Sequence, residues 1–296
     1  MKKTIYYLLA GVGVSAMFVF GGCSKSESLP AIDGYNSSND VAKANLVAHW
    51  TFDGTNNETI SNTAPSNTYG TVGFGTGQLG QALKLTEGAL VFPTIAAIND
   101  ANALNNFTVS LWVNVKGTKD TNGAFTSFFG LIPTGVTDIW GDVAANAETS
   151  HHKSDSDTLE LKNLLNTHPV GGGNSLQDNI ANGANSAPWF LGGGADHWAH
   201  YVLRWDGTTH QFFLFGNGVS SGAYTDRGTT GVEIMSVPVQ AVFGSLASSD
   251  IGFTGAPAQQ TWNPWATAMV DDVRIYNTAL ADKDVTALYD LGKAGR

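Results

Sequence analysis

The chain is poor in cysteine and in charged residues. It has one cysteine among 296 residues, so no disulfide can form within a single chain. Charged residues make up only 14% of it, well below the roughly 25% that is usual in soluble domains. Its 25 acidic residues outnumber the 15 lysines and arginines, which gives a formal net charge of −10. This balance excludes a nucleic-acid partner, because binding a phosphate backbone requires clustered positive charge.

The composition also excludes disorder for most of the chain. Hydrophobic residues make up 42% and aromatic residues 10%, whereas disordered chains are low in both. From Leu46 onward, short apolar runs recur between Gly, Asn, Asp and Pro. That pattern is typical of strands joined by turns. We therefore expect an all-β fold, and the length suits a single β-sandwich domain.

The one long apolar run lies at the N-terminus. Ile5–Phe20 follows two lysines and precedes two glycines and Cys23, the order found in secretory signals. The end of this segment resembles the bacterial lipobox, which implies a lipid on Cys23 and a lipid anchor in the bacterial outer membrane, on either its surface or its periplasmic side. An uncleaved membrane anchor is the alternative, since the run nearly reaches the length of a membrane span.

Three regions follow from these features. Residues 1–22 form the predicted signal peptide, and residues 23–44 form a lipidated cysteine with a flexible tether. The tether is predicted because this stretch is polar and has no sustained apolar period. Residues 45–296 form the folded domain, in which nothing marks a further division.

Eight strands and one helix are predicted within the domain. Phe107–Val115 is the clearest strand, because apolar and polar residues alternate along it. Asp206 and Gly207 predict a tight hairpin, and Ala281–Leu291 has the apolar stripe of a short helix. Residues 117–196 are expected to hold two or three further strands with long loops. The other strands are predicted at Leu46–Phe52, Tyr69–Phe74, Ala82–Leu85, Trp198–Trp205, Gln211–Phe215, Gln240–Leu246 and Ala268–Tyr276.

Four segments of the chain together resemble one family. They read LVAHWTFDG, FTVSLWVNV, DHWAHYVLRWDGTTHQFFLFGNGV and MVDDVRIYNTALADKDVTALY, and in this order they are similar to LamG-like jelly-roll domains of the concanavalin A-like lectin and glucanase superfamily. The resemblance implies two antiparallel sheets packed face to face, with ligand loops along one edge. This superfamily contains lectins, carbohydrate-binding modules, glycoside hydrolases and protein-binding domains, so the fold alone does not decide the function.

Catalytic residues are not predicted. A glucanase needs two carboxylates on one face of a strand, but no glutamate of the chain is followed by another acidic residue at even spacing in a strand. Residues 218–222 (GVSSG) match the spacing Gly-x-Ser-x-Gly, but no helix is predicted after them, so they do not form the strand-to-helix turn that nucleophilic catalysis needs. His151 and His152 are adjacent and would point to opposite faces of a strand, so we expect a solvated loop rather than a metal site there.

Acidic residues near the first and last strands predict a structural Ca²⁺ ion. Asp53 and Glu58 follow the first strand and resemble acidic positions of the family, while Asp271 and Asp272 lie in the last. Calcium takes 6–8 oxygen ligands, and a buried carboxylate needs a cation or hydrogen-bond donors. The hypothesis is that Asp53 shares Ca²⁺ with Asp271 or Asp272. The alternative is capping of turn amides and an ion pair with Arg274.

Aromatic residues in loops predict a sugar-binding site. Sugar rings stack on exposed aromatic side chains, and amides bind their hydroxyl groups. The segment QQTWNPWAT places aromatic and amide groups in one loop, with a plug over the sandwich edge as the alternative. The candidates there are Gln260, Trp262, Asn263 and Trp265, and Trp140 and Trp189 are further candidates.

The sequence therefore predicts a lipid-anchored protein that binds carbohydrate and captures polysaccharide. A surface domain that binds a protein partner is the second hypothesis, and a glycoside hydrolase is the third. An exposed aromatic groove would favour sugar, whereas a flat apolar patch would favour a protein.

Overall fold

A computed structural model describes residues 29–169, 175–177, 189–191, 197–224, 233–237 and 239–296. The chain divides into two compact units, Met1–Pro30 and Ala31–Arg296, and the second contains every helix and strand described. The predicted signal peptide and Cys23 lie outside the described residues. Within the described ranges, no helix has both the length and the apolar character needed to cross a membrane.

Antiparallel strands dominate the second unit. The strands are β1 (Leu46–Trp50), β2 (Asn67–Thr76), β3 (Gln81–Thr94), β4 (Asn106–Asn114), β5 (Thr126–Pro133), β6 (Val143–Ala147), β7 (Thr158–Pro169), β8 (Ser175–Gln177), β9 (Trp189–Leu191), β10 (Ala199–Asp206), β11 (Gln211–Gly216), β12 (Val219–Tyr224), β13 (Glu233–Ile234), β14 (Val239–Phe243) and β15 (Ala266–Tyr276). The helices are α1 (Asp282–Lys293) and the 3₁₀ turns η1 (Ser38–Asp40), η2 (Lys43–Asn45), η3 (Ala96–Ile98), η4 (Thr149–His151) and η5 (Ser249–Ile251).

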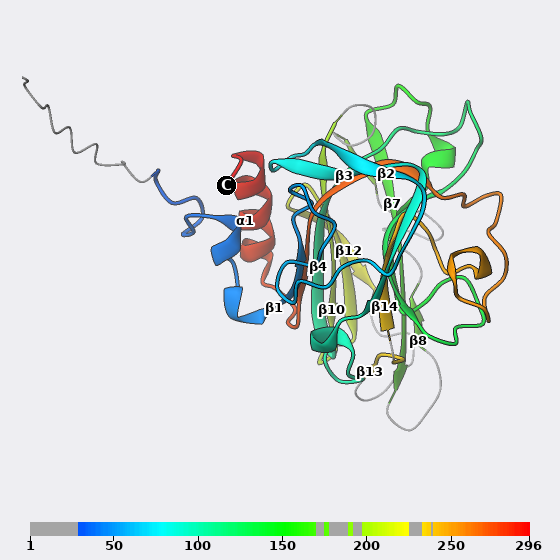
Figure 1. Ribbon diagram of the computed structural model, residues 1–296. Coiled ribbons are helices and arrows are strands. Elements are labelled where there is room, and N and C mark those ends of the chain that lie inside the picture. The colour runs from blue at the N-terminus through cyan, green and yellow to red at the C-terminus, as the bar shows by residue number, and fades with distance from the viewer. Residues whose placement is uncertain (1–28, 170–174, 178–188, 192–196, 225–232, 238) are drawn as a thin grey trace, which may run out of the picture. The chain divides into compact units, whose positions relative to one another are not determined.

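The strands form one sheet that curls into two layers. Its order is β12-β11-β10-β4-β15-β3-β14-β5-β6-β7-β13, with β1 on β15, β2 on β3, and β8 and β9 on β7. In Figure 1, β4 and β10 stand in the layer beside α1, and β7 and β14 stand opposite. The long strand β3 joins the layers, because its first part pairs with β15 and its last part with β14. The all-β sandwich with a short C-terminal helix is therefore confirmed.

An aromatic cluster fills the space between the layers. Trp50 from β1 lies 5.5 Å from Phe92, 6.0 Å from Phe129 and 5.3 Å from Phe243, measured between ring centroids. The rings meet edge to face or tilted, which are the arrangements aromatic side chains prefer. All four side chains are fully buried. Since no disulfide is available, the burial of such side chains holds the two layers together.

The alternation predicted for β4 is present, but both of its faces are covered. Phe107, Val109 and Leu111 belong to the core between the layers. Trp112 on the other face is also buried, because it stacks on Tyr289 of α1 at 5.8 Å. The helix covers what would otherwise be the solvent face of this layer.

The segment before β1 packs onto the domain. Val41 is 1% exposed and shares an apolar cluster with Leu280, Val285 and Leu288 at α1. The Tyr35 hydroxyl donates a hydrogen bond to Asp284 at 2.8 Å. The compact unit thus begins at Ala31, upstream of the boundary at residue 45 that the sequence indicates.

Several local predictions differ from the structure. Residues 117–196 contain five described strands rather than two or three, because alternation is weak in β5, where every residue is buried. The predicted hairpin between β10 and β11 exists, but Asp206 pairs with Gln211 and the loop holds four residues. Trp198 is half-buried and lies just before β10, so this strand begins one residue later than predicted.

Candidate functional site

The strand β15 changes its partner halfway along its length. It pairs with β3 up to Val270 and with β1 from Val273, while β4 accompanies its other edge. The register shifts between these halves, and Asp272 has a φ of 46°, a left-handed conformation that costs energy for a residue other than glycine. This bulge places the adjacent carboxylates of Asp271 and Asp272 inside the protein, 0% and 5% exposed.

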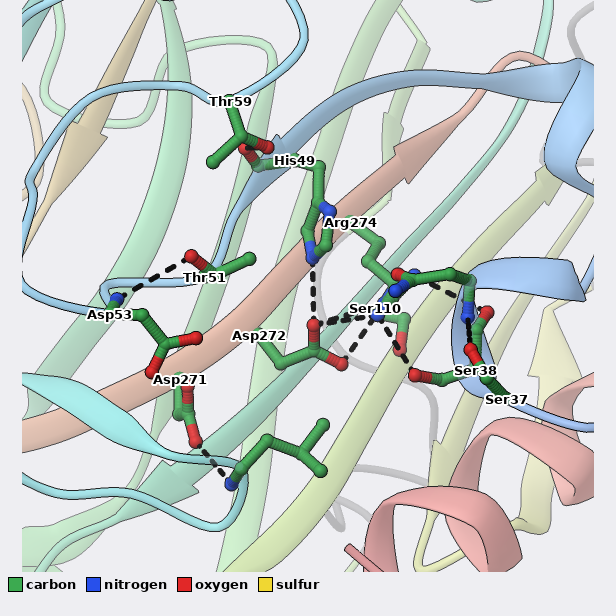
Figure 2. Close-up of polar contacts among 12 residues, drawn as sticks. Ser37, Ser38, His49, Thr51, Asp53, Thr59, Ser110, Asp271, Asp272 and Arg274 are labelled. Carbon is green, nitrogen blue, oxygen red and sulfur yellow. Dashed lines mark hydrogen bonds and ion pairs between the residues drawn. The ribbon is translucent and has the colours of Figure 1, made fainter. Parts of the chain in front are cut away.

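Asp272 is held by a buried ion pair (Figure 2). The Arg274 guanidinium donates to both carboxylate oxygens, with Nε 3.0 Å from Oδ2 and Nη2 2.8 Å from Oδ1. His49 Nε2 lies 2.7 Å from Oδ1. Burial by itself would raise the pKa of this carboxyl group, but Arg274 and His49 hold it well below its usual range. Asp272 therefore makes the ion pair that was the alternative to a calcium site.

Asp271 and Asp53 bind the turn between β2 and β3. Asp271 Oδ2 accepts a hydrogen bond from the Leu79 amide at 2.8 Å, and Asp53 Oδ1 accepts one from the Gln81 amide at 2.7 Å. The turn needs glycine here, because a Cβ on Gly77 would collide with the Asp271 carboxylate and one on Gly80 with that of Asp53. Both carboxylates line a cavity of about 150 Å³.

One carboxylate oxygen in this cavity has no partner. Asp271 Oδ1 is buried and has no hydrogen-bond partner among the described residues. Burial, with the nearby charges of Asp272 and Asp53, raises the pKa of Asp271 to about 8. This oxygen is suited to binding a cation, because burying an isolated carboxylate costs free energy. Across the described ranges, however, no group of three or more His, Cys, Asp or Glu side chains is arranged to hold a metal. A calcium ion would need backbone carbonyls and water beside Asp53 and Asp271.

Glu58 has a different role from the one predicted. Its fully buried carboxylate accepts hydrogen bonds from the amides of His49 at 2.7 Å, Ile60 at 2.9 Å and Ser61 at 2.6 Å. It is not among the residues that line the cavity of Asp53 and Asp271. The side chain fixes the loop that follows β1.

The segment 259–265, which we call the tryptophan loop, presents an exposed aromatic side chain. A tight turn, closed by the Asn263 amide donating to the Gln260 carbonyl at 3.1 Å, carries Trp262 at its tip. The side chain of Trp262 is 40% exposed. It lies 6.0 Å from Trp140 with ring planes inclined by 34°, and 6.2 Å from Phe125 edge to face. Two aromatic neighbours thus fix the orientation of an exposed indole ring.

Trp265 at the base of the loop lines a second hollow. The half-buried ring packs 5.6 Å from Tyr69, and its Nε1 donates to Gln259 Oε1 at 3.0 Å. The adjoining cavity has a volume of about 610 Å³. Its walls include Gln260, Thr261, Glu87 and Asp250. An indole ring, an amide, a hydroxyl and two carboxylates therefore surround a space of ligand size.

The other predicted sugar contacts divide between structural and undetermined roles. Asn263 is 1% exposed and donates from Nδ2 to Ser127 Oγ at 3.0 Å, so it anchors the tryptophan loop. Trp140 is half-buried beside Trp262. Trp189 lies in β9, where its backbone pairs with Glu160 of β7. The side chain of Trp189 lies outside the described part of the structure.

Comparison with known proteins agrees with this architecture. No protein-family model matches the chain, and no curated protein sequence matches it. Solved structures do match. The chain is a jelly-roll β-sandwich.

Three solved structures illustrate the similarity. The binding domain of botulinum neurotoxin DC in complex with SialylT has a TM-score of 0.54 and 15% identity, over 86% of this chain and 52% of that chain. The binding domain of Paraclostridial mosquitocidal protein 1 has a TM-score of 0.52 and 14% identity, over 83% and 52%.

Domain 4 of AbnA, a GH43 extracellular arabinanase from Geobacillus stearothermophilus, in complex with arabinotriose, has a TM-score of 0.48 and 18% identity, over 82% and 98%. The jelly-roll chain spans about half the length of the two toxin domains. At these identities the likeness shows the fold alone.

Two groups in the jelly roll were missed by the sequence analysis. His151 ends η4 and His152 follows it, outside any strand as predicted, and both lie against one carboxylate oxygen of Glu160, at 2.9 and 3.1 Å. Phe125 lies beneath Trp262 just before β5, within residues 117–196, where the sequence did not place individual strands. Neither arrangement has a signal in residue spacing.

Asp142 at the start of β6 is a second buried carboxyl group. It is 1% exposed, and its Oδ2 has no hydrogen-bond partner among the described residues. Burial raises the pKa of Asp142 to about 8, from 3.8. The folded state therefore binds this proton more tightly than the unfolded state does. Its contribution to stability is complete below pH 3.8 and is lost as the pH rises toward about 8.

We expect the Asp142→Asn variant to lose this pH dependence. Between pH 5 and pH 8 its free energy of unfolding should rise relative to wild type by at least about 1 kcal/mol, roughly one pKa unit. Urea titrations with a chelator at both pH values measure the difference, and Asp120→Asn, an exposed carboxylate in a loop, is the control. Equal pH dependence in wild type and Asp142→Asn would contradict the assignment.

Proposed function

We propose that this jelly roll binds carbohydrate through the tryptophan loop. The observation that carries the proposal is the exposed indole of Trp262, which Trp140 and Phe125 hold in a fixed orientation. A rigid aromatic face loses little conformational entropy when a sugar ring stacks on it. Beside it, Gln260 and Thr261 supply hydrogen-bonding groups for hydroxyls in the cavity next to Trp265.

The proposal agrees with a protein of the same fold. The botulinum neurotoxin DC binding domain is described in complex with SialylT. This chain matches 52% of that domain, so the comparison supports the proposal through the shared fold. The role proposed for this chain is the capture of polysaccharide at the bacterial outer membrane.

Removing the exposed indole is expected to weaken sugar binding. Trp262→Ala should lower the affinity for the polysaccharide that wild type binds by at least about tenfold, which corresponds to about 1.4 kcal/mol. Native gels containing polysaccharides, followed by calorimetry on the best one, measure this. Phe74→Ala removes another exposed aromatic ring, 38% exposed on β2, and should bind as wild type does.

Two results would contradict the proposal. Binding by Trp262→Ala at wild-type affinity would remove the tryptophan loop from the site. Failure of wild type to bind any polysaccharide would favour the second hypothesis, a protein partner, which cross-linking in the native membrane would then identify.

The carboxylates of Glu87 and Asp250 are relevant to the third hypothesis, that the protein is a glycoside hydrolase. Both line the cavity beside Trp265, and a glycoside hydrolase needs two carboxyl groups across its substrate. Asp250 Oδ2 already accepts the Gln259 amide at 2.7 Å, so it fixes the tryptophan loop. We therefore assign these groups to hydroxyl binding. Release of reducing sugar from the bound polysaccharide, abolished by Glu87→Gln, would overturn this assignment.

We also propose a structural Ca²⁺ ion between Asp53 and Asp271. The unpartnered oxygen of Asp271 and the cavity of about 150 Å³ support it. Such an ion would join the turn between β2 and β3 to the last strand.

Calcium should then raise the stability of the protein. A ligand at 100 times its Kd stabilises a fold by about 2.7 kcal/mol, so 5 mM CaCl₂ should raise the Tm of wild type by several degrees over chelator. Asp53→Asn and Asp271→Asn should abolish the rise, whereas Asp155→Asn, in an exposed loop, should retain it. A wild-type Tm that is the same in calcium and in chelator would contradict the proposed Ca²⁺ site.

The proposed location is the bacterial outer membrane, through a lipid on Cys23. The order of lysines, apolar run, glycines and cysteine at the N-terminus supports it. Two or more acyl chains hold a protein on a membrane far better than one.

Mass spectrometry of the protein from its native membrane tests this location. The mature chain should begin at Cys23 and carry lipid, and Cys23→Ser should remain unprocessed and unlipidated. A wild-type chain that retains residues 1–22 without lipid would favour the uncleaved anchor instead.

A further inference from the structure

A third hollow lies on the outer face of the sheet where β3, β15 and β4 run side by side. The pairing register places Lys84, Met269 and Asn114 in one row across these strands. Thr267 lies two residues before Met269 in β15, and Lys116 lies two residues after Asn114. The hollow has a volume of about 370 Å³, and all five of these residues line it.

The charge of this hollow differs from that of the rest of the protein. Its lining includes two lysines and, within the part of the chain that is described, no Asp or Glu. The chain as a whole has a net charge of −10, and the cavity beside Trp265 is lined by Glu87 and Asp250. An anionic group of a ligand would therefore be attracted to the lysines and repelled from the neighbouring cavity.

The floor of the hollow suits a sugar as well as an ion. Both lysine side chains are exposed and Met269 lies half-buried between the flanking strands. The thioether offers an apolar surface to a ring face, and the hydroxyl of Thr267 and the amide of Asn114 can bind hydroxyl groups. The combination suits a charged sugar better than a simple inorganic anion.

The hollow continues the cavity of the tryptophan loop. Trp265, Thr267 and Met269 are alternate residues leading into and along β15, so they share its outer face. Alternate residues of a strand are about 6.8 Å apart, and Thr267 is therefore one step from Trp265. The Glu87 amide donates to Thr267 Oγ1 at 3.0 Å where the two hollows meet. One oligosaccharide can therefore contact both.

We infer that the ligand is an acidic glycan whose carboxylate or sulfate group binds Lys84 and Lys116 while a neighbouring ring contacts the tryptophan loop. This inference rests on the proposed function, because it names the class of sugar that the same surface takes. Lysine is a point charge with rotatable donors and accepts either anion.

The test compares three polymers on the full chain. Polygalacturonate supplies carboxylates, dextran sulfate supplies sulfates, and dextran is the neutral reference. Wild type should bind one acidic polymer at least about tenfold more tightly than dextran at 50 mM salt, with the preference shrinking at 500 mM because salt screens exposed charges. The polymer that binds identifies the anion.

Substitutions of lysine test where the anionic group of the ligand binds. Lys84→Gln with Lys116→Gln should lose at least about tenfold in affinity for the acidic polymer. Lys84→Gln alone should also lower this affinity while retaining the Tm of wild type, because the Lys84 side chain is exposed. Lys283→Gln, which removes an exposed charge on α1, should bind as wild type does.

The outcomes separate this inference from the proposed function. Equal binding of dextran and the acidic polymers, or an acidic preference unchanged in the double lysine variant, would overturn the acidic glycan and leave the tryptophan loop as a neutral sugar site. Binding of no polysaccharide by wild type would overturn both. Acidic binding that survives Trp262→Ala but not the lysine variants would support the lysine site and overturn the role of the tryptophan loop.

Discussion

The fold depends on the ion pair between Asp272 and Arg274. It lies where β15 leaves β3 and joins β1, so it fixes the strand that pairs with β3, β4 and β1. A buried charge without its partner costs several kcal/mol, and the left-handed backbone at Asp272 adds strain. Only a bidentate guanidinium, with His49 as a second contact, makes the bulge tolerable. The bulge in turn buries the neighbouring carboxylate of Asp271, which creates the place proposed for a cation between Asp53 and Asp271.

The ligand surfaces are the outer face of the same strand. Ala266, Ala268 and Val270 point into the core, and the alternate residues therefore point outward. The tryptophan loop precedes β15 directly, so the chain that enters the core also positions the proposed binding surface. Rigidity follows from this arrangement, because the loop is fastened to β5 by the buried contact between Asn263 and Ser127. A ligand site built on such a strand needs little reorganisation on binding.

The charges are distributed unevenly along this surface. Carboxylates lie beside Trp265 and lysines lie beside Met269, although the chain has few charges in total. In a protein with 14% charged residues, a hollow lined by two lysines has a large effect on the local potential. A polymer whose anionic groups are spaced along its chain would match this pattern better than a polymer of uniform charge.

The sequence by itself determined the class of the fold, most of its strands and the C-terminal helix, because alternation, turn residues and an apolar stripe are local properties. It also singled out Asp53, Asp271, Trp262 and Trp265. Only the tertiary structure decided their partners. Asn263 became an anchor and Glu58 a loop cap because buried polar groups take the nearest hydrogen-bond partners. These partners lie far away in the sequence or in a turn whose shape the sequence does not predict. The hollow between Lys84 and Lys116 exists only because β15 brings β3 and β4 together, and the register that aligns them is set by long-range pairing.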